Sequence, residues 1–286
     1  MPGRVALVTD STSSLPADLI ASYRIEVVPL QVVIGARSFA EASEATPETV
    51  ATALRAFAPV STSRPSPEAF ARIYQAAADS GCEAVVSVHL SGEVSGTYDS
   101  ARLAAASAPL PVETVDSRQV GMGAGFAVLA AAEAVAAGAT AEQAAQAAAK
   151  TAAATRTYFY VDTLEHLRRG GRIGAAAALL GSALAVKPLL TVTDGRIGPL
   201  EKVRTAARAL ARIEELVSEA AAACVGPVDV AVQHLASAQR AESVAARLEG
   251  RLDVHQMFVS EVGAVIGAHV GPGMVAVAVA PRFALG

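Results

Sequence analysis

The sequence predicts an α/β protein of two domains: an N-terminal α/β domain with a parallel sheet and a C-terminal α/β domain with a mixed sheet. Over the first half of the chain, short apolar runs alternate with helix-like segments, which is the pattern of βαβ units. In the second half, Asp194-Gly195 stands between two apolar runs and indicates a hairpin, which requires antiparallel strands. A chain of 286 residues is long enough for two modest domains. We place the boundary after residue 156, so the expected domains are residues 1–156 and 157–286.

The elements of the N-terminal domain follow from apolar runs and helix caps. Thr46-Pro47 is the clearest helix start, because threonine accepts a backbone hydrogen bond and proline fits the first helical turn. The expected strands are residues 5–9, 25–34 (interrupted at Pro29), 84–90 and 112–115, and the expected helices are residues 15–23, 47–58, 67–80, 95–106, 120–137 and 140–155.

The C-terminal domain combines strands, long helices and one long uncharged run. Glycines and a proline interrupt the run at residues 262–281, so it predicts two short strands around a loop, not a membrane span. His269 would lie in that loop, where the flanking glycines let a ligand approach. The other expected strands are residues 158–161, 189–192, 197–203, 228–234 and 254–258, and the expected helices are residues 163–169, 205–224 and 237–248.

Composition and charge exclude several classes of partner. The net charge is −4 and no basic block is interleaved with aromatic residues, so nucleic acid is not an expected partner. Cys82 and Cys224 lie far apart beside apolar segments, which predicts free thiols in a reducing compartment. The chain starts without a signal-peptide pattern, so we expect a cytoplasmic protein. Asp10 and Asp116 follow strands without a third ligand at a recognisable spacing, so we expect no metal and no cofactor.

The most informative segment is the turn of residues 91–97, Ser-Gly-Glu-Val-Ser-Gly-Thr, between a buried strand and a helix start. Such a turn points hydroxyls and backbone N–H groups at an anion. It carries no lysine, which favours a small negative head group over a triphosphate. Capping of the following helix by Ser91, Ser95 and Thr97 explains the hydroxyls equally well. A Gly-x-Ser-x-Gly elbow is absent around Ser95, which disfavours a serine hydrolase.

Two further segments offer anion-binding groups. Thr62 and Ser63 could form a loop facing the 91–97 turn, although a cap cluster before the helix at Pro67 is the better interpretation of that segment alone. Arginines surround Gly170-Gly171, and Arg204 precedes a later helix. Arginine recognises phosphate or carboxylate through its fork of donors, and it also stabilises solvated helix ends.

Taken together, these segments resemble the DegV family of bacterial fatty-acid-binding proteins. Arg64 departs from the family pattern, because glutamine is common there, and Gly92-Glu93 replaces a usual Ser and Gly. The joint order and spacing of the matching segments carry the resemblance, and they are residues 8–13, 62–65, 89–101, 116–117 with 121–125, 164–173, 186–190 with 194–195, 202–205 and 263–273.

The resemblance implies a long-chain fatty acid in a tunnel between the two domains. Its carboxyl group would be bound by hydroxyls matching Thr62 and Ser95, with His269 close by. The family presents the acid to a separate ATP-dependent fatty acid kinase subunit, which forms the acyl phosphate, and has no turnover of its own. No stable membrane insertion is implied. The secondary ligand or partner contacts would be Ser63, Gly96, Thr97, Arg172 and Arg204.

Two other functions stay open at this point. One is a regulatory protein that senses a small anion through the same turn. The other is an acyl hydrolase that uses Ser95 with His269. An enzyme, whether this hydrolase or a phosphotransferase, is disfavoured because the sequence has no Walker loop, no clear metal set and no serine elbow.

Overall fold

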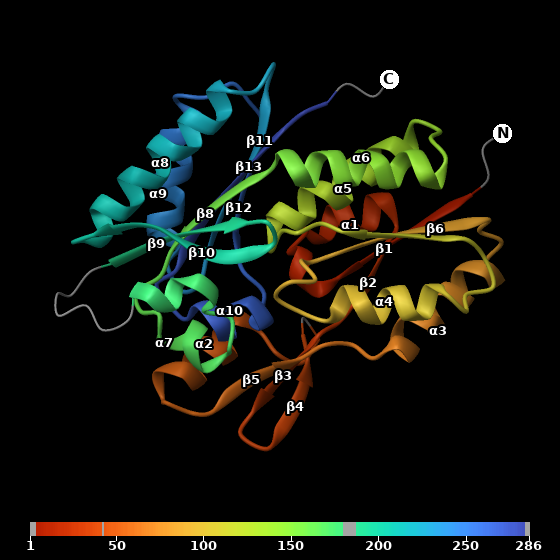
Figure 1. The fold of residues 1–286 in the computed structure, drawn as a ribbon, viewed down its shortest axis with the longest axis horizontal. Helices are drawn as coiled ribbons and strands as arrows, with labels where there is room; N and C mark the ends of the chain where they lie inside the picture. The colour runs from red at the N-terminus through yellow and green to blue at the C-terminus, as the bar shows by residue number, and fades with distance from the viewer. Residues whose placement is uncertain (1–3, 42, 180–186, 284–286) are drawn as a thin grey trace. The chain divides into compact units, whose positions relative to one another are not determined.

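The computed structural model describes residues 4–41, 43–179 and 187–283, and the chain forms two compact units (Figure 1). The first unit comprises residues 1–30, 63–154 and 283–286, and the second comprises residues 31–62 and 155–282. The chain therefore passes from one unit to the other between Thr62 and Ser63. None of the helices described is long and apolar enough to cross a membrane.

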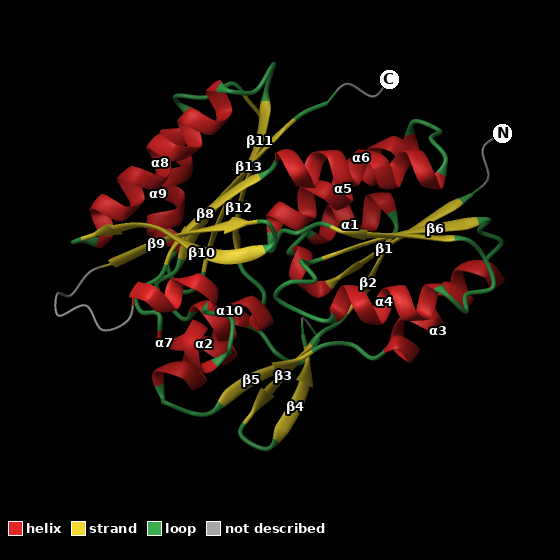
Figure 2. Ribbon diagram, in the orientation of Figure 1, coloured by secondary structure: helices red, strands yellow, loops and turns green. Residues whose placement is uncertain are grey.

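The first unit is built on a parallel sheet of four strands in the order β2-β1-β6-β7. The pair α3 and α4 covers one face and the pair α5 and α6 the other, as βαβ connections require (Figure 2). The strands are β1 (Val5–Asp10), β2 (Ile25–Val28), β6 (Ala84–His89) and β7 (Val112–Asp116), and the helices are η1 (Ser11–Ser13), α1 (Ala17–Tyr23), α3 (Pro67–Asp79), α4 (Thr97–Ala105), α5 (Met122–Ala136) and α6 (Ala141–Ala154).

The second unit contains a mixed sheet of six strands in the order β10-β9-β8-β13-β11-β12 and a small sheet in the order β4-β3-β5. In the larger sheet, β11 and β12 are parallel and the other neighbours are antiparallel. The strands are β3 (Gln31–Ile34), β4 (Arg37–Ala40), β5 (Val60–Ser63), β8 (Arg156–Tyr160), β9 (Lys187–Thr193), β10 (Arg196–Val203), β11 (Val228–His234), β12 (Val254–Glu261) and β13 (Val275–Pro281), and the helices are α2 (Pro47–Arg55), α7 (Glu165–Arg169), η2 (Gly174–Leu179), α8 (Ala206–Ala222), α9 (Ala238–Glu249) and α10 (Ala264–Val270).

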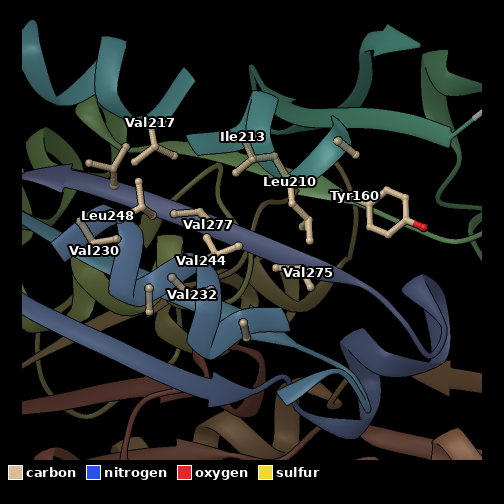
Figure 3. Packing of buried hydrophobic residues seen from close by; sticks show 14 of the residues in the cluster. Tyr160, Leu210, Ile213, Val217, Val230, Val232, Val244, Leu248, Val275 and Val277 are labelled. Atoms are coloured by element: carbon tan, nitrogen blue, oxygen red, sulfur yellow. The ribbon is translucent and has the colours of Figure 1, made fainter. Parts of the chain in front are cut away.

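The main core of the second unit lies where α8 and α9 pack on the large sheet (Figure 3). Ile213 and Val217 on α8 meet Val277 on β13, and all three are fully buried. Each such side chain contributes about 1.5–3 kcal/mol through burial. This core anchors β13, the strand that follows α10.

The hairpin predicted from Asp194-Gly195 is confirmed. Strands β9 and β10 pair antiparallel, with Arg196 opposite Thr193. Asp194 and Gly195 have φ of 51° and 80°, the left-handed values that a two-residue hairpin turn demands.

Residues 25–34, expected as one interrupted strand, form two strands of different sheets. Strand β2 pairs with β1 in the first unit, and β3 pairs with β4 in the second. The contiguous division at residue 156 differs from the observed units, because residues 31–62 group with the second unit. Contacts of α2 and β3 with α10 account for this grouping.

The expected loop around His269 is wrong, because residues 264–270 form α10. The buried carboxyl of Glu41 accepts the N–H of Val265 at 2.7 Å, across 224 positions of sequence. Gly263 leaves room for that carboxyl: a Cβ there would lie 2.3 Å from Oε1 of Glu41. Gly267 packs against Leu235. The glycines therefore serve close packing of a helix, which their local pattern does not reveal.

Candidate functional site

Thr62 and His269, two of the expected ligand-binding residues, meet in the second unit. Thr62 lies near the end of β5 and His269 in the last turn of α10. Oγ1 of Thr62 lies 2.8 Å from Nε2 of His269, a hydrogen bond between residues 207 positions apart. Both side chains are partly exposed. The hydroxyl of Thr62 therefore bonds histidine and does not cap the helix that begins at Pro67.

The other ring nitrogen of His269 is unsatisfied. Nδ1 is buried and has no hydrogen-bond partner among the residues that the structure describes. Burial and, to a smaller extent, the positive charge of Arg172 together lower the pKa of His269 to about 4. The imidazole is therefore neutral near pH 7. Buried polar atoms without partners are rare and mark sites that deserve a functional explanation.

Two glycines hold α7 and α10 close enough to fix this ring. A Cβ on Gly170 would lie 2.1 Å from Nδ1 of His269, and a Cβ on Gly271 would lie 2.1 Å from Cδ2 of His166. Nη1 of Arg172 donates to the carbonyl of Gly170 at 2.8 Å. The absence of a side chain at Gly170 thus makes room for the ring of His269, and the hydrogen bond from Arg172 holds Gly170 in place.

The donor in the bond between Thr62 and His269 depends on the tautomer of the imidazole ring. In the tautomer that carries its proton on Nε2, this nitrogen donates to Oγ1 of Thr62. The hydroxyl proton of Thr62 is then free to be donated to a ligand.

The 91–97 turn forms the second candidate feature, in the first unit. Oγ of Ser95 lies 2.9 Å from Oγ1 of Thr97. Asp116 holds the turn by accepting the N–H of Gly92 at 3.1 Å. Gly96 occupies the N-cap position of α4 and has no side chain to cap the helix. Oγ of Ser95 accepts the N–H of Thr97, the first residue of α4, at 3.4 Å, so the capping interpretation holds in part for Ser95, which stays partly exposed.

The remaining expected contacts are scattered over the two units. The hydroxyl of Ser63 donates locally to the carbonyl of Arg64 at 3.4 Å. Arg204 is exposed just before α8, whose first turn is capped by Thr205. Arg168 and Arg169 form exposed ion pairs with Glu165 at 2.7 and 2.6 Å, so they match the solvated helix-end interpretation.

Sequence reasoning missed a buried polar network in the first unit. Oδ2 of Asp10 lies 3.0 Å from Nδ1 of His89, whose Nε2 lies 2.7 Å from Oγ of Ser87. The hydroxyl of Tyr74 lies 2.8 Å from the same Oγ, and burial raises the pKa of Tyr74 to about 12. The alternation of Ser87 and His89 on one face of β6 was the available signal.

This network is structural. Its order, acid–histidine–serine, is that of a hydrolase triad. All four residues are 0% exposed, so Ser87 has no access to a substrate. Asp10 also accepts the N–H groups of Thr12 and Leu90, so its carboxyl holds the turn that follows β1. Across the described residues, no group of three or more His, Cys, Asp or Glu side chains could hold a metal ion.

Fold and site define a two-unit α/β protein in which a neutral histidine supports a hydroxyl donor. The chain belongs to the DegV family, whose model, described as "Uncharacterised protein, DegV family", matches residues 4–282. The DegV domain-containing protein SCO2569 of Streptomyces coelicolor is 54% identical over 99% of this chain and 100% of that protein. Protein DegV of Bacillus subtilis is 34% identical over 94% of this chain and 96% of its own length.

Solved structures share the whole fold. A DegV family protein from Thermus thermophilus, described by its fatty acid binding, is 35% identical with a TM-score of 0.93, over 98% of this chain and 100% of that one. DegV of Bacillus subtilis, described as a fatty acid binding protein, is 32% identical with a TM-score of 0.90, over 98% and 100% of the two chains.

Proposed function

We propose that this protein binds a long-chain fatty acid and does not itself catalyse a reaction. Thr62 and Ser95 hold the carboxyl group, and His269 orients Thr62. The observation that carries the proposal is the 2.8 Å bond from Thr62 to a neutral, half-satisfied histidine. It stands in a chain that is 35% identical to the fatty-acid-binding protein of Thermus thermophilus.

The physical chemistry of the ligand fits this site. A long acyl chain gains about 0.8 kcal/mol for each CH₂ group that it buries. A buried carboxylate is costly unless donors satisfy it. The Thr62 hydroxyl, aligned by His269, and the Ser95 hydroxyl are such donors. Ser63, Gly96 and Thr97 adjoin these two and complete the head-group surroundings.

We place the acyl chain in a tunnel between the two units. This placement rests on the resemblance to the DegV family, and Thr62 and Ser95 belong to different units.

Presentation to a separate ATP-dependent kinase subunit, which forms the acyl phosphate, is the second part of the proposal. Arg204, exposed before α8, offers a cationic contact to that subunit or to the phosphate, and Arg172 offers a second. Both cysteines are free thiols, which supports a reducing, cytoplasmic setting. The variant Arg204→Ala should bind fatty acid normally and support slower acyl-phosphate formation; equal loss of both would contradict this role.

Native mass spectrometry tests the binding proposal. Delipidated protein is incubated with palmitate or oleate, and the mass of the intact protein is recorded. The proposal predicts one added acyl-chain mass per chain. A protein that takes up neither acid refutes it, and binding of a sugar phosphate without lipid would instead favour the small-anion sensor.

A further inference from the structure

An arginine lies directly on the 91–97 turn. A Cβ built on Gly96 would lie 1.8 Å from Nη1 of Arg64 and 2.9 Å from its Cζ. The guanidinium of Arg64 therefore rests on the residue between Ser95 and Thr97. Arg64 and the turn belong to the same unit.

The guanidinium of Arg64 is exposed. Among the described residues, no side chain or backbone group forms a hydrogen bond or an ion pair with it. Arg102 on α4 shows the contrast, because it pairs with Asp99 at 3.7 Å. A planar fork of donors placed beside two hydroxyls is suited to a carboxylate.

We propose that the guanidinium of Arg64 binds the ionised head group of the ligand and so distinguishes it from neutral head groups. The proposal rests on the function proposed above and adds selectivity to it. Hydroxyl donors alone serve a carboxylic acid, an ester or an alcohol almost equally. A guanidinium adds a charge-assisted bond that only an ionised head group can use. The protein therefore selects fatty acid anions over neutral lipids of the same chain length.

The exposure of Arg64 makes this selectivity sensitive to salt. Charges at a partly solvated site are screened within about 8 Å at physiological ionic strength. Added salt should therefore weaken palmitate binding and leave hexadecanol binding nearly unchanged.

Competition binding with a fluorescent fatty acid tests the proposal on delipidated full-length protein. The probes are palmitate and hexadecanol, and the variants are Arg64→Gln, Arg64→Lys and the matched control Arg102→Gln. Losing a charged hydrogen bond should weaken palmitate binding about 10-fold or more in Arg64→Gln. Hexadecanol affinity should change less than about 2-fold, because a neutral head group forms no charge-assisted bond. Arg64→Lys should retain part of the palmitate affinity, and Arg102→Gln should retain all of it.

The outcomes separate the two proposals. A wild-type protein that binds neither palmitate nor oleate refutes the proposed function. A wild-type protein that binds palmitate, with Arg64→Gln binding it equally well, refutes only the role of Arg64. Equal weakening of palmitate and hexadecanol by Arg64→Gln also overturns that role, because it would show a packing effect without charge selection. Thermal unfolding of each variant confirms that the exposed substitution leaves the fold intact.

Discussion

Two histidines of this chain occupy opposite kinds of environment. His89 is fully buried, and both of its ring nitrogens have partners, Asp10 and Ser87. His269 is partly exposed, and only its Nε2 is paired, with Thr62. A buried histidine whose two ring nitrogens both have hydrogen-bond partners stabilises a core. A histidine with one unpaired ring nitrogen can instead orient a neighbouring hydroxyl toward a ligand. The comparison supports a structural role for His89 and agrees with the binding role proposed for His269.

The largest expected effect is on stability and falls on the His89 network. His89→Ala removes one hydrogen-bond partner from the Asp10 carboxyl and one from the Ser87 hydroxyl and leaves a cavity in the core, which should lower the free energy of unfolding by about 3–5 kcal/mol. Urea denaturation followed by circular dichroism measures it. His269→Ala is the matched comparison, and its free energy of unfolding should fall clearly less. Equal losses of unfolding free energy in the two variants would contradict the different roles of the two histidines.

The next effect is on binding. Thr62→Val keeps the shape of the side chain and removes the hydroxyl, so fatty acid affinity should fall by about 1–3 kcal/mol. Ser95→Ala should cause a loss of the same size. Ser61→Ala, an exposed neighbour on β5, is the control and should bind normally. Calorimetric titration with palmitate measures all three, and wild-type affinity in Thr62→Val would remove that residue from the site.

A smaller effect should follow from displacing His269 without altering it. Gly170→Ala puts a methyl group where Nδ1 of His269 lies. The ring must shift, so palmitate affinity should fall by about 1 kcal/mol as the Thr62 bond is weakened. Gly198→Ala adds a methyl group that meets nothing within 4 Å and serves as the control. If both alanine variants bind palmitate like the wild type, the ring position does not matter to binding.

A separate effect concerns the pH dependence of stability. Burial lowers the pKa of His269 to about 4, whereas an unfolded histidine ionises near about 6.5. Between these values the unfolded chain takes up a proton that the folded chain does not. The free energy of unfolding should therefore fall as the pH drops from about 6.5 to about 4, and be fully retained above that window.

His269→Gln should reduce the fall in unfolding free energy at low pH, when unfolding is measured across the same pH range. Burial also lowers the pKa of His166 and His234, so part of the slope should remain in the variant. An unchanged slope would show that His269 is not protected from protonation.

Local signals in the sequence predicted most elements, because caps and hairpin turns act within a few residues. The turn at Asp194-Gly195 is an example, since its two left-handed residues determine the pairing of β9 and β10. Helix α10 could not be predicted in this way. Its start depends on Glu41, 224 positions away from the N–H that it accepts.

The site was predicted unevenly for the same reason. Local motifs and the resemblance to a family both single out Thr62, Ser95 and His269, but the bond between Thr62 and His269 is a long-range contact that no local pattern encodes. The contact of Arg64 with Gly96 was equally invisible. The network of Asp10 and His89 was missed because the sequence does not show that inward-facing polar residues on buried strands lie within hydrogen-bonding distance of one another.

The most direct test is ¹⁵N NMR of the two histidine side chains, with and without palmitate. The account predicts that His269 is neutral at pH 7, carries its proton on Nε2 and shifts when palmitate binds, while the resonances of His89 stay unchanged. A His269 that ionises near pH 6.5, or whose resonances ignore palmitate as those of His89 do, would contradict the account.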